Sequence, residues 1–188
     1  MSYAGDCMQF KKNPKLEFKI LEQEVKIIPS NHYAEKAHGH VNSSMETAYE
    51  IQTITTNFED GYCVLLNKVS FKIGYNDFII HINPEYEKDS CEYEIVLKHE
   101  MQHVDAYLSV INMEKKRLEE SFHFSANSIF PIFIKDLSEL EIATDSIKQQ
   151  LEDNPKMKLS IQKIMAEQEI RNRRIDEDPE NKKINECE

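Results

Sequence analysis

The period of the apolar residues changes once along this chain of 188 residues, near Asn83-Pro84. Before that point, apolar and charged side chains alternate in short runs, which is the period of a half-buried β-strand. After it, apolar residues recur every three or four positions, as in an amphipathic helix. Strands followed by helices predict an α+β fold. The expected strands are Lys15–Ile20, Glu24–Ile28, Tyr49–Thr56, Tyr62–Ile73 and Phe78–Ile82.

The helical half predicts one long helix and two shorter ones. Asp89 or Ser90 can cap the first helix, and its apolar period continues for about 30 residues. The expected segments after it are an irregular aromatic-rich stretch over 122–134 and helices over 137–151 and 158–174. We expect one domain over 1–188, with mainly β structure in 1–88, mainly α structure in 89–175 and a charged tail in 176–188. The sheet is expected to be mostly antiparallel and to pack on the first helix.

Composition excludes two classes of function. The chain carries 34 acidic and 23 basic residues, a net charge of -11, which disfavours a protein that follows nucleic-acid phosphates. Its apolar runs are only a few residues long, whereas a spanning helix needs roughly 20. We therefore expect no nucleic-acid partner and no membrane insertion.

The sharpest motif is H-E-x-x-H, formed by His99, Glu100 and His103 in the first predicted helix. Side chains four residues apart leave the same helix face, so both imidazoles can bind one Zn²⁺. Glu100 projects beside the metal, where it can take a proton from zinc-bound water as the general base. The predicted strand just upstream fits this chemistry, because an edge strand can pair with an extended peptide substrate.

The motif leaves the third zinc ligand open, since a catalytic zinc takes three protein ligands and a water. Position 109 is serine, so the third histidine of a metzincin is absent. A helix hairpin near Ser128 would favour Glu152 or Asp153, whereas a looser return of the chain would favour another group. The remaining candidates are Glu139, Glu141, Asp145, Asp176 and His123.

Smaller features have both a functional and a packing interpretation. Tyr107 lies one helical turn beyond His103 and could stabilise an oxyanion or simply pack in the core. Asp105 could orient a ligand histidine or lie in solvent. His81 is expected to pack. A polar loop with three histidines could form a second metal site or be solvated; these residues are His32, His38 and His40.

The stretch "FIIHINPEYEKDSCEYEIVLKHEMQHVDAYLSV" resembles a poorly characterised group of exported bacterial proteins identified as zinc-dependent proteases. In that group, strands lead into a Ser-Cys-x-Tyr element and an H-E-x-x-H helix, which here correspond to Ser90, Cys91, Tyr93 and His99 to His103. The tail "RRIDEDPENKKINEC" is similar to the acidic ending of the same group. The resemblance covers about two thirds of the chain and implies a zincin-like fold, export and disulfide bonds.

Four cysteines allow two disulfides. We expect Cys63–Cys91, which would pin the active-site helix to the sheet, and Cys7–Cys187, which would join the chain ends. The first residues lack the basic and apolar regions of a signal peptide. The expected location is nevertheless periplasmic or secreted, with a cytoplasmic protein of four free thiols as the alternative.

Together these features predict a zinc-dependent peptidase that acts on a peptide or protein substrate, with His99 and His103 as ligands and Glu100 as the base. The alternative is a non-catalytic zincin-like binding or scaffold domain in which zinc is structural. A third interpretation is a helical interaction protein that binds no zinc.

Overall fold

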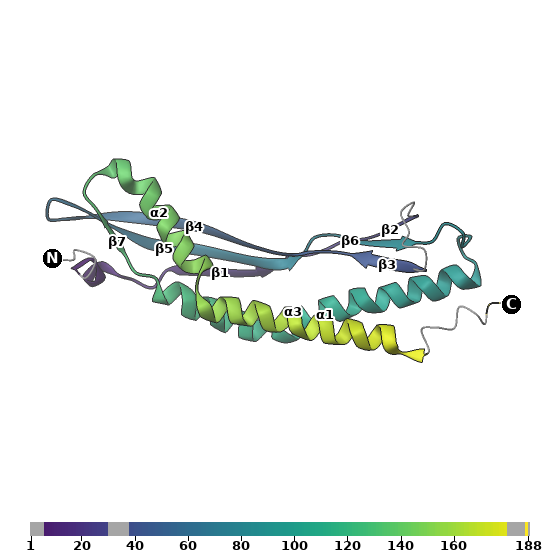
Figure 1. The fold of residues 1–188 in the computed structure, drawn as a ribbon. Helices are drawn as coiled ribbons and strands as arrows, with labels where there is room; N and C mark the ends of the chain where they lie inside the picture. The colour runs from purple at the N-terminus through teal and green to yellow at the C-terminus, as the bar shows by residue number, and fades with distance from the viewer. Residues whose placement is uncertain (1–5, 30–37, 180–186, 188) are drawn as a thin grey trace. The chain divides into compact units, whose positions relative to one another are not determined.

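The computed structural model describes residues 6–29, 38–179 and 187, and it confirms an α+β protein (Figure 1). Seven strands and three α-helices are present in the described part of the chain. The strands are β1 (Lys15–Ile20), β2 (Val25–Pro29), β3 (Gly39–Asn42), β4 (Met45–Phe58), β5 (Gly61–Tyr75), β6 (Phe78–Ile82) and β7 (Ile132–Ile134). The helices are α1 (Cys91–Ser128), α2 (Leu140–Glu152) and α3 (Pro155–Glu177), with 3-10 turns η1 (Asp6–Phe10) and η2 (Leu137–Glu139).

The chain divides into two compact units, each with its own sheet. The first unit comprises residues 1–20, 47–73 and 116–162, and the second comprises residues 21–46, 74–115 and 163–188. Helix α1 contributes to both units, since its residues up to Lys115 belong to the second and the following ones to the first.

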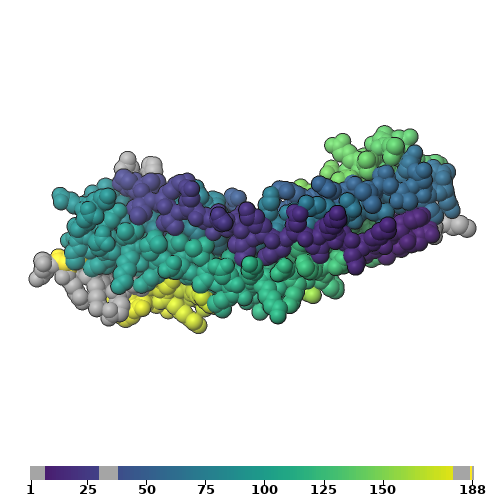
Figure 2. All heavy atoms as spheres, turned by 180° about the vertical axis from the view of Figure 1, so that it is seen from behind, coloured from purple at the N-terminus to yellow at the C-terminus, as the bar shows by residue number. Residues whose placement is uncertain are grey.

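The first unit is built on β5, which pairs in parallel with β1 and antiparallel with β7, and has β4 as its other neighbour. Aromatic rings hold the sheet against α1: Phe71 of β5 lies 5.6 Å from Phe122 of α1 between ring centroids. The ring of Phe18 of β1 packs on the ring of Phe71, with 6.0 Å between the centroids. β1 alternates exposed and half-buried residues, as an edge strand does, and its side chains are at the surface in Figure 2.

The second unit contains the sheet β2-β6-β3, in which β6 pairs in parallel with β2 and antiparallel with β3. Alternate residues of β6 are buried, which places Phe78, Ile80 and Ile82 on one face. Val96 and Val104 supply the buried side of α1 in this unit. The strand order β2-β6-β3 makes the short strand β3 an outer strand of this sheet. It approaches α1 closely at Gly39.

Three features of the fold differ from the prediction. The strands form two sheets rather than one, and each contains a parallel pair besides an antiparallel pair. Strands β3 and β7 were not predicted, because each is only three or four residues long and takes its conformation from pairing with a neighbour. The segment predicted as irregular after Phe122 instead continues α1 to Ser128.

All four cysteines form disulfides, but the pairs are Cys7–Cys63 and Cys91–Cys187. The predicted pairs Cys63–Cys91 and Cys7–Cys187 were therefore wrong. The reason is the length of β5: the strand runs extended from Cys63 to Tyr75, which is about 40 Å at roughly 3.3 Å per residue. A disulfide requires α-carbons within about 7 Å, so the chain would have to fold straight back to bring Cys91 to Cys63.

The two disulfides indicate that the protein matures in an oxidising compartment. Among the described residues, no helix combines the length and the apolar character that crossing a membrane requires.

Candidate metal centre

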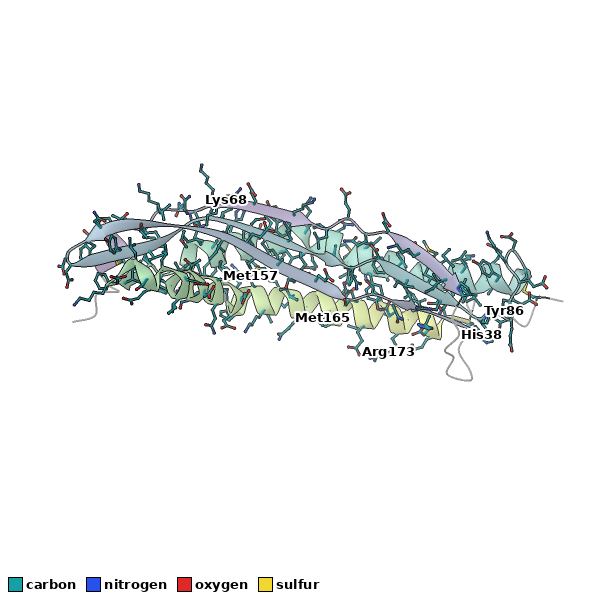
Figure 3. All side chains as sticks on the ribbon, turned by 90° about the horizontal axis from the view of Figure 1, so that it is seen from above. His38, Lys68, Tyr86, Met157, Met165 and Arg173 are labelled. Atoms are coloured by element: carbon teal, nitrogen blue, oxygen red, sulfur yellow. A yellow bond between two sulfur atoms is a disulfide. The ribbon has the colours of Figure 1, made fainter. Side chains whose placement is uncertain are left out.

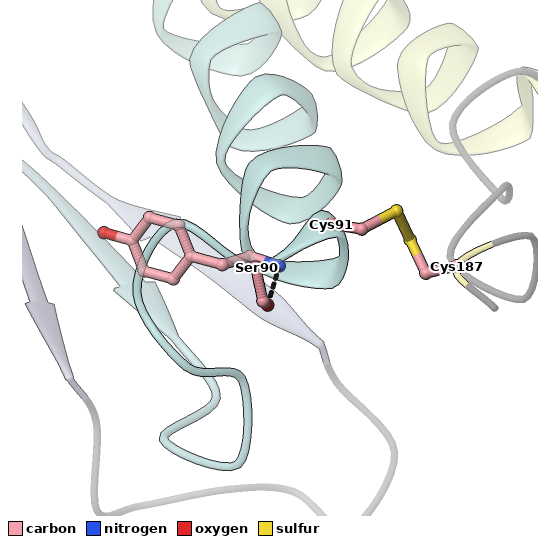
Figure 4. The surroundings of a disulfide bond; sticks show 4 residues. Ser90, Cys91 and Cys187 are labelled. Carbon is pink, nitrogen blue, oxygen red and sulfur yellow. Dashed lines mark hydrogen bonds between the residues drawn. A yellow bond between two sulfur atoms is a disulfide. The ribbon is translucent and has the colours of Figure 1, made fainter.

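The helix that carries the H-E-x-x-H motif begins at a well-defined cap. The Ser90 hydroxyl accepts a hydrogen bond from the backbone N–H of Tyr93 at 3.2 Å (Figure 4). This is the N-cap geometry that the sequence allowed for either Asp89 or Ser90. Asp89 instead has a φ of 67°, in the left-handed region, which turns the chain into the helix. The cap sets the helix register and thereby the face on which His99 and His103 lie.

His99 and His103 point their Nε2 atoms at each other, 3.3 Å apart, with the ring planes at 88°. Asp176, in the last turn of α3, completes the group. Its Oδ1 lies 3.1 Å from His103 Nε2 and 3.5 Å from His99 Nε2. Asp176 was one of the open alternatives for the third ligand, and the structure brings it to both histidines.

The three distances fit a tetrahedral metal site. Ligand atoms about 2.0–2.1 Å from one tetrahedral ion lie about 3.3–3.4 Å from each other. The spacings of 3.1, 3.3 and 3.5 Å match this value without rearrangement. His99, His103 and Asp176 can therefore hold a metal ion, and within the described ranges they are the only cluster of three such residues.

The other candidates for the third ligand do not join this cluster. All of them belong to the first unit and are exposed: His123, Glu139, Glu141, Asp145, Glu152 and Asp153. Several have other partners there. Glu152 pairs with Lys148, and Asp153 pairs with Lys158.

Asn172 is the functional residue that the sequence analysis missed. It lies one turn before Asp176 on α3, and its Oδ1 is 3.1 Å from Nδ1 of His103. If Nδ1 donates its proton to this amide oxygen, Nε2 is left free to bind a metal. Asp105, for which this orienting role was considered, is exposed. The only sequence signal for Asn172 is its spacing of four residues from Asp176.

Arg171 holds the end of α3 on α1. Its guanidinium donates to the Ser109 hydroxyl at 3.0 Å and contacts the Met113 sulfur at 3.2 Å. It also pairs with Glu167 one turn earlier on α3. These contacts fix the register of the two helices, so that the next residue, Asn172, faces His103.

Glu100 is almost fully buried, with 3 % of its surface exposed. Burial raises the pKa of its carboxyl group to about 7; the neighbouring His103 opposes this shift and Asp176 adds to it. Gly39 of β3 makes room for the carboxyl group, because a Cβ at that position would lie 3.2 Å from Glu100 Oε1 and 2.6 Å from Val96 Cγ1. A raised pKa near neutrality is typical of a group that transfers protons at pH 7.

These groups share one cavity of about 300 Å³ within the second unit. One wall is the outer strand β3 and the other is formed by α1 and α3. The lining residues are Gly39, His40, Val41, His99, Glu100, His103, Tyr107, Asn172 and Asp176.

Of the second metal site that was considered, the described residues His38 and His40 contact other side chains and do not join a cluster of metal-ligating residues. The His38 ring contacts the Tyr86 hydroxyl (Figure 3), and the His40 ring stacks on His81 at 4.5 Å. His32 lies outside the described residues. The backbone N–H of Asn83 also donates to the His38 carbonyl at 3.0 Å, so the start of β3 is fixed to the chain that follows β6.

Tyr107 packs in the core, as one of its two interpretations predicted, and it also borders the cavity. Its ring packs against Tyr75 at 5.1 Å and Phe78 at 5.8 Å, yet it is only half-buried and lines the cavity.

Comparison with known proteins found no match: no protein-family model, no curated protein and no solved structure is significantly similar to this chain.

Proposed function

We propose that this protein is a zinc-dependent peptidase. The observation that carries the proposal is the triad of His99, His103 and Asp176, whose ligand atoms have tetrahedral spacing, with the buried carboxyl group of Glu100 in the same cavity. Two imidazoles and one carboxylate are a donor set that suits zinc. A structural zinc is usually enclosed by four protein ligands, whereas three leave a position for reactants. This favours catalysis over the scaffold alternative.

The residues of the chain divide the chemistry among them. When bound, zinc would supply a Lewis acid that polarises a peptide carbonyl and lowers the pKa of a water molecule. Glu100 takes a proton from the attacking water as the new C–O bond forms. It then gives this proton to the amine nitrogen as the C–N bond breaks. Its burial supports this role, because burial favours the protonated form that the carboxyl group takes once it has accepted the proton.

The substrate would be an extended peptide segment. Among the described residues, β3 pairs with β6 on one side only, so its other side can hydrogen-bond to a peptide backbone. Because Gly39, His40 and Val41 line the cavity, a peptide added to this strand would pass over the triad. The two disulfides support a periplasmic or secreted location for this activity.

The first test separates metal binding from catalysis. Glu100→Gln should still bind one zinc per chain but should lose hydrolysis of a fluorogenic peptide library by roughly 10²–10⁴-fold, since the general base is removed. His103→Ala should lose both zinc and hydrolysis. Zinc content by elemental analysis and initial rates on the same library are the two measurements.

Asp105→Asn is the matched control, because Asp105 is an exposed carboxylate on the same helix and does not line the cavity. It should keep both zinc and activity. Full activity of Glu100→Gln would disprove the proposed catalytic role. A wild-type protein that binds zinc without hydrolysing any peptide would support the scaffold alternative.

A further inference from the structure

The side chain of His40 has no role in the chemistry described so far. His40 lies on β3, is half-buried and lines the same cavity as Glu100 and the triad. It is not part of the metal-binding group, although it offers the same ligand atoms as His99 and His103. Because its ring borders the cavity without being a candidate ligand, it is available to contact a molecule bound there.

The ring of His40 is held in place by a second histidine. His40 and His81 are direct partners in the β3–β6 register, and their rings stack with centroids 4.5 Å apart and planes at 14°. His81 is placed by β6, the strand that pairs on both sides in its sheet. Burial and the nearby His81 lower the pKa of His40, so its ring is mainly neutral at pH 7 and carries one N–H donor.

Peptide hydrolysis needs such a donor. As water attacks, negative charge develops on the carbonyl oxygen, and fixed hydrogen-bond donors that face this oxygen lower the barrier. Most polar groups of the cavity are already used: three are the candidate ligands, Glu100 is the base, and Asn172 binds His103. His40 and Tyr107 remain as donors. Of these two, only His40 comes from the strand on which the substrate would lie.

We propose that His40 is a catalytic residue that donates a hydrogen bond to the carbonyl oxygen of the scissile peptide bond, and that His81 is the positioning residue for its ring. This inference rests on the proposed peptidase function. His40 makes and breaks no covalent bond, and its hydrogen bond strengthens as the oxygen becomes negative. A peptide paired with β3 places its backbone in a fixed register relative to His40.

The test uses the full-length, zinc-loaded protein and the same fluorogenic peptide library. His40→Phe keeps an aromatic ring for stacking but removes the donor. It should lower kcat by roughly 10²–10³-fold, with KM changed by less than about threefold and zinc content unchanged. His40→Gln returns an N–H donor, and its kcat should be about tenfold or more above that of His40→Phe. His81→Ala should lower kcat less than His40→Phe does.

His123→Phe is the matched control, because His123 is an exposed histidine of α1 outside the cavity. It should leave kcat unchanged. If the phenyl ring prevents folding, His40→Ala gives the same comparison without added bulk. A kcat within about threefold of wild type in the variants that lack the donor would overturn the role of His40, as would loss of zinc from them. Failure of the wild-type protein to bind zinc or cleave peptides would instead overturn the proposed function, and this inference with it.

Discussion

At the scale of single residues, the site depends on groups that are not themselves candidate metal ligands. Gly39 lets β3 approach α1 so closely that the Glu100 carboxyl group is covered, which is what raises its pKa. Asn172 binds the far side of the His103 ring and fixes its orientation. Both residues act by position, and a sequence motif defined by ligands and base alone does not include them.

The role of Asn172 can be measured as metal affinity. Asn172→Ala removes the acceptor for His103 Nδ1, so the ring loses both its orientation and its preference for a free Nε2. We expect zinc affinity to fall roughly 10–100-fold. Competition with a chelating dye measures the dissociation constant. Glu169→Ala, an exposed position on the same helix that pairs with Arg173, is the control and should leave the affinity unchanged. Equal affinities of wild type and Asn172→Ala would remove Asn172 from the site.

At the scale of elements, the site lies where two helix segments and one strand meet. α1 supplies His99, Glu100 and His103 from successive turns, and the C-terminal turns of α3 supply Asn172 and Asp176. β3 closes the cavity from the sheet side. The regular period of the helices was predictable, because burial of one face imposes it on the sequence. The approach of α3 to α1 was not, because it depends on contacts such as that of Arg171 with Ser109.

The start of α1 gives a prediction for stability. Ser90→Ala removes the side-chain acceptor for the Tyr93 N–H and leaves a helix end without its cap. The free energy of unfolding should fall by about 1 kcal/mol. Urea denaturation measures this change, and Ser90→Asp, which restores a capping oxygen, should recover most of it. A Ser90→Ala protein as stable as wild type would mean that the cap contributes nothing measurable.

At the scale of the whole molecule, each disulfide belongs to one unit. Cys7–Cys63 is in the first unit, and both of its cysteines are fully buried. Cys91–Cys187 is in the second unit and joins the first residue of α1 to the chain beyond α3 (Figure 4). The helical residues that form the metal site all lie between these two cysteines. The second disulfide therefore limits how far Asp176 can move away from the histidines.

This arrangement predicts different effects for the two bonds. Replacing both Cys91 and Cys187 by Ser frees a segment of 96 residues, for which chain entropy gives a stability loss of about 4–5 kcal/mol. The affinity for zinc should fall as well, because without this disulfide Asp176 can move further from the two histidines. Replacing Cys7 and Cys63 should lower stability but leave zinc affinity nearly unchanged in the folded protein. Calorimetry and zinc titration distinguish the two; equal zinc affinity in all three proteins would show that the Cys91–Cys187 bond does not support the site.

The sequence by itself determined the fold class, most strand and helix positions, the two histidines four residues apart and the neighbouring glutamate. These follow from local periodicity and spacing, which a single helix or strand imposes on its own residues. Only the tertiary structure decided that Asp176 joins the histidines, that Asn172 orients one of them, and that Cys91 pairs with Cys187. Each of these contacts joins residues at least 69 positions apart in the chain. Contacts over that distance depend on how the elements pack, and no local pattern in the sequence encodes them.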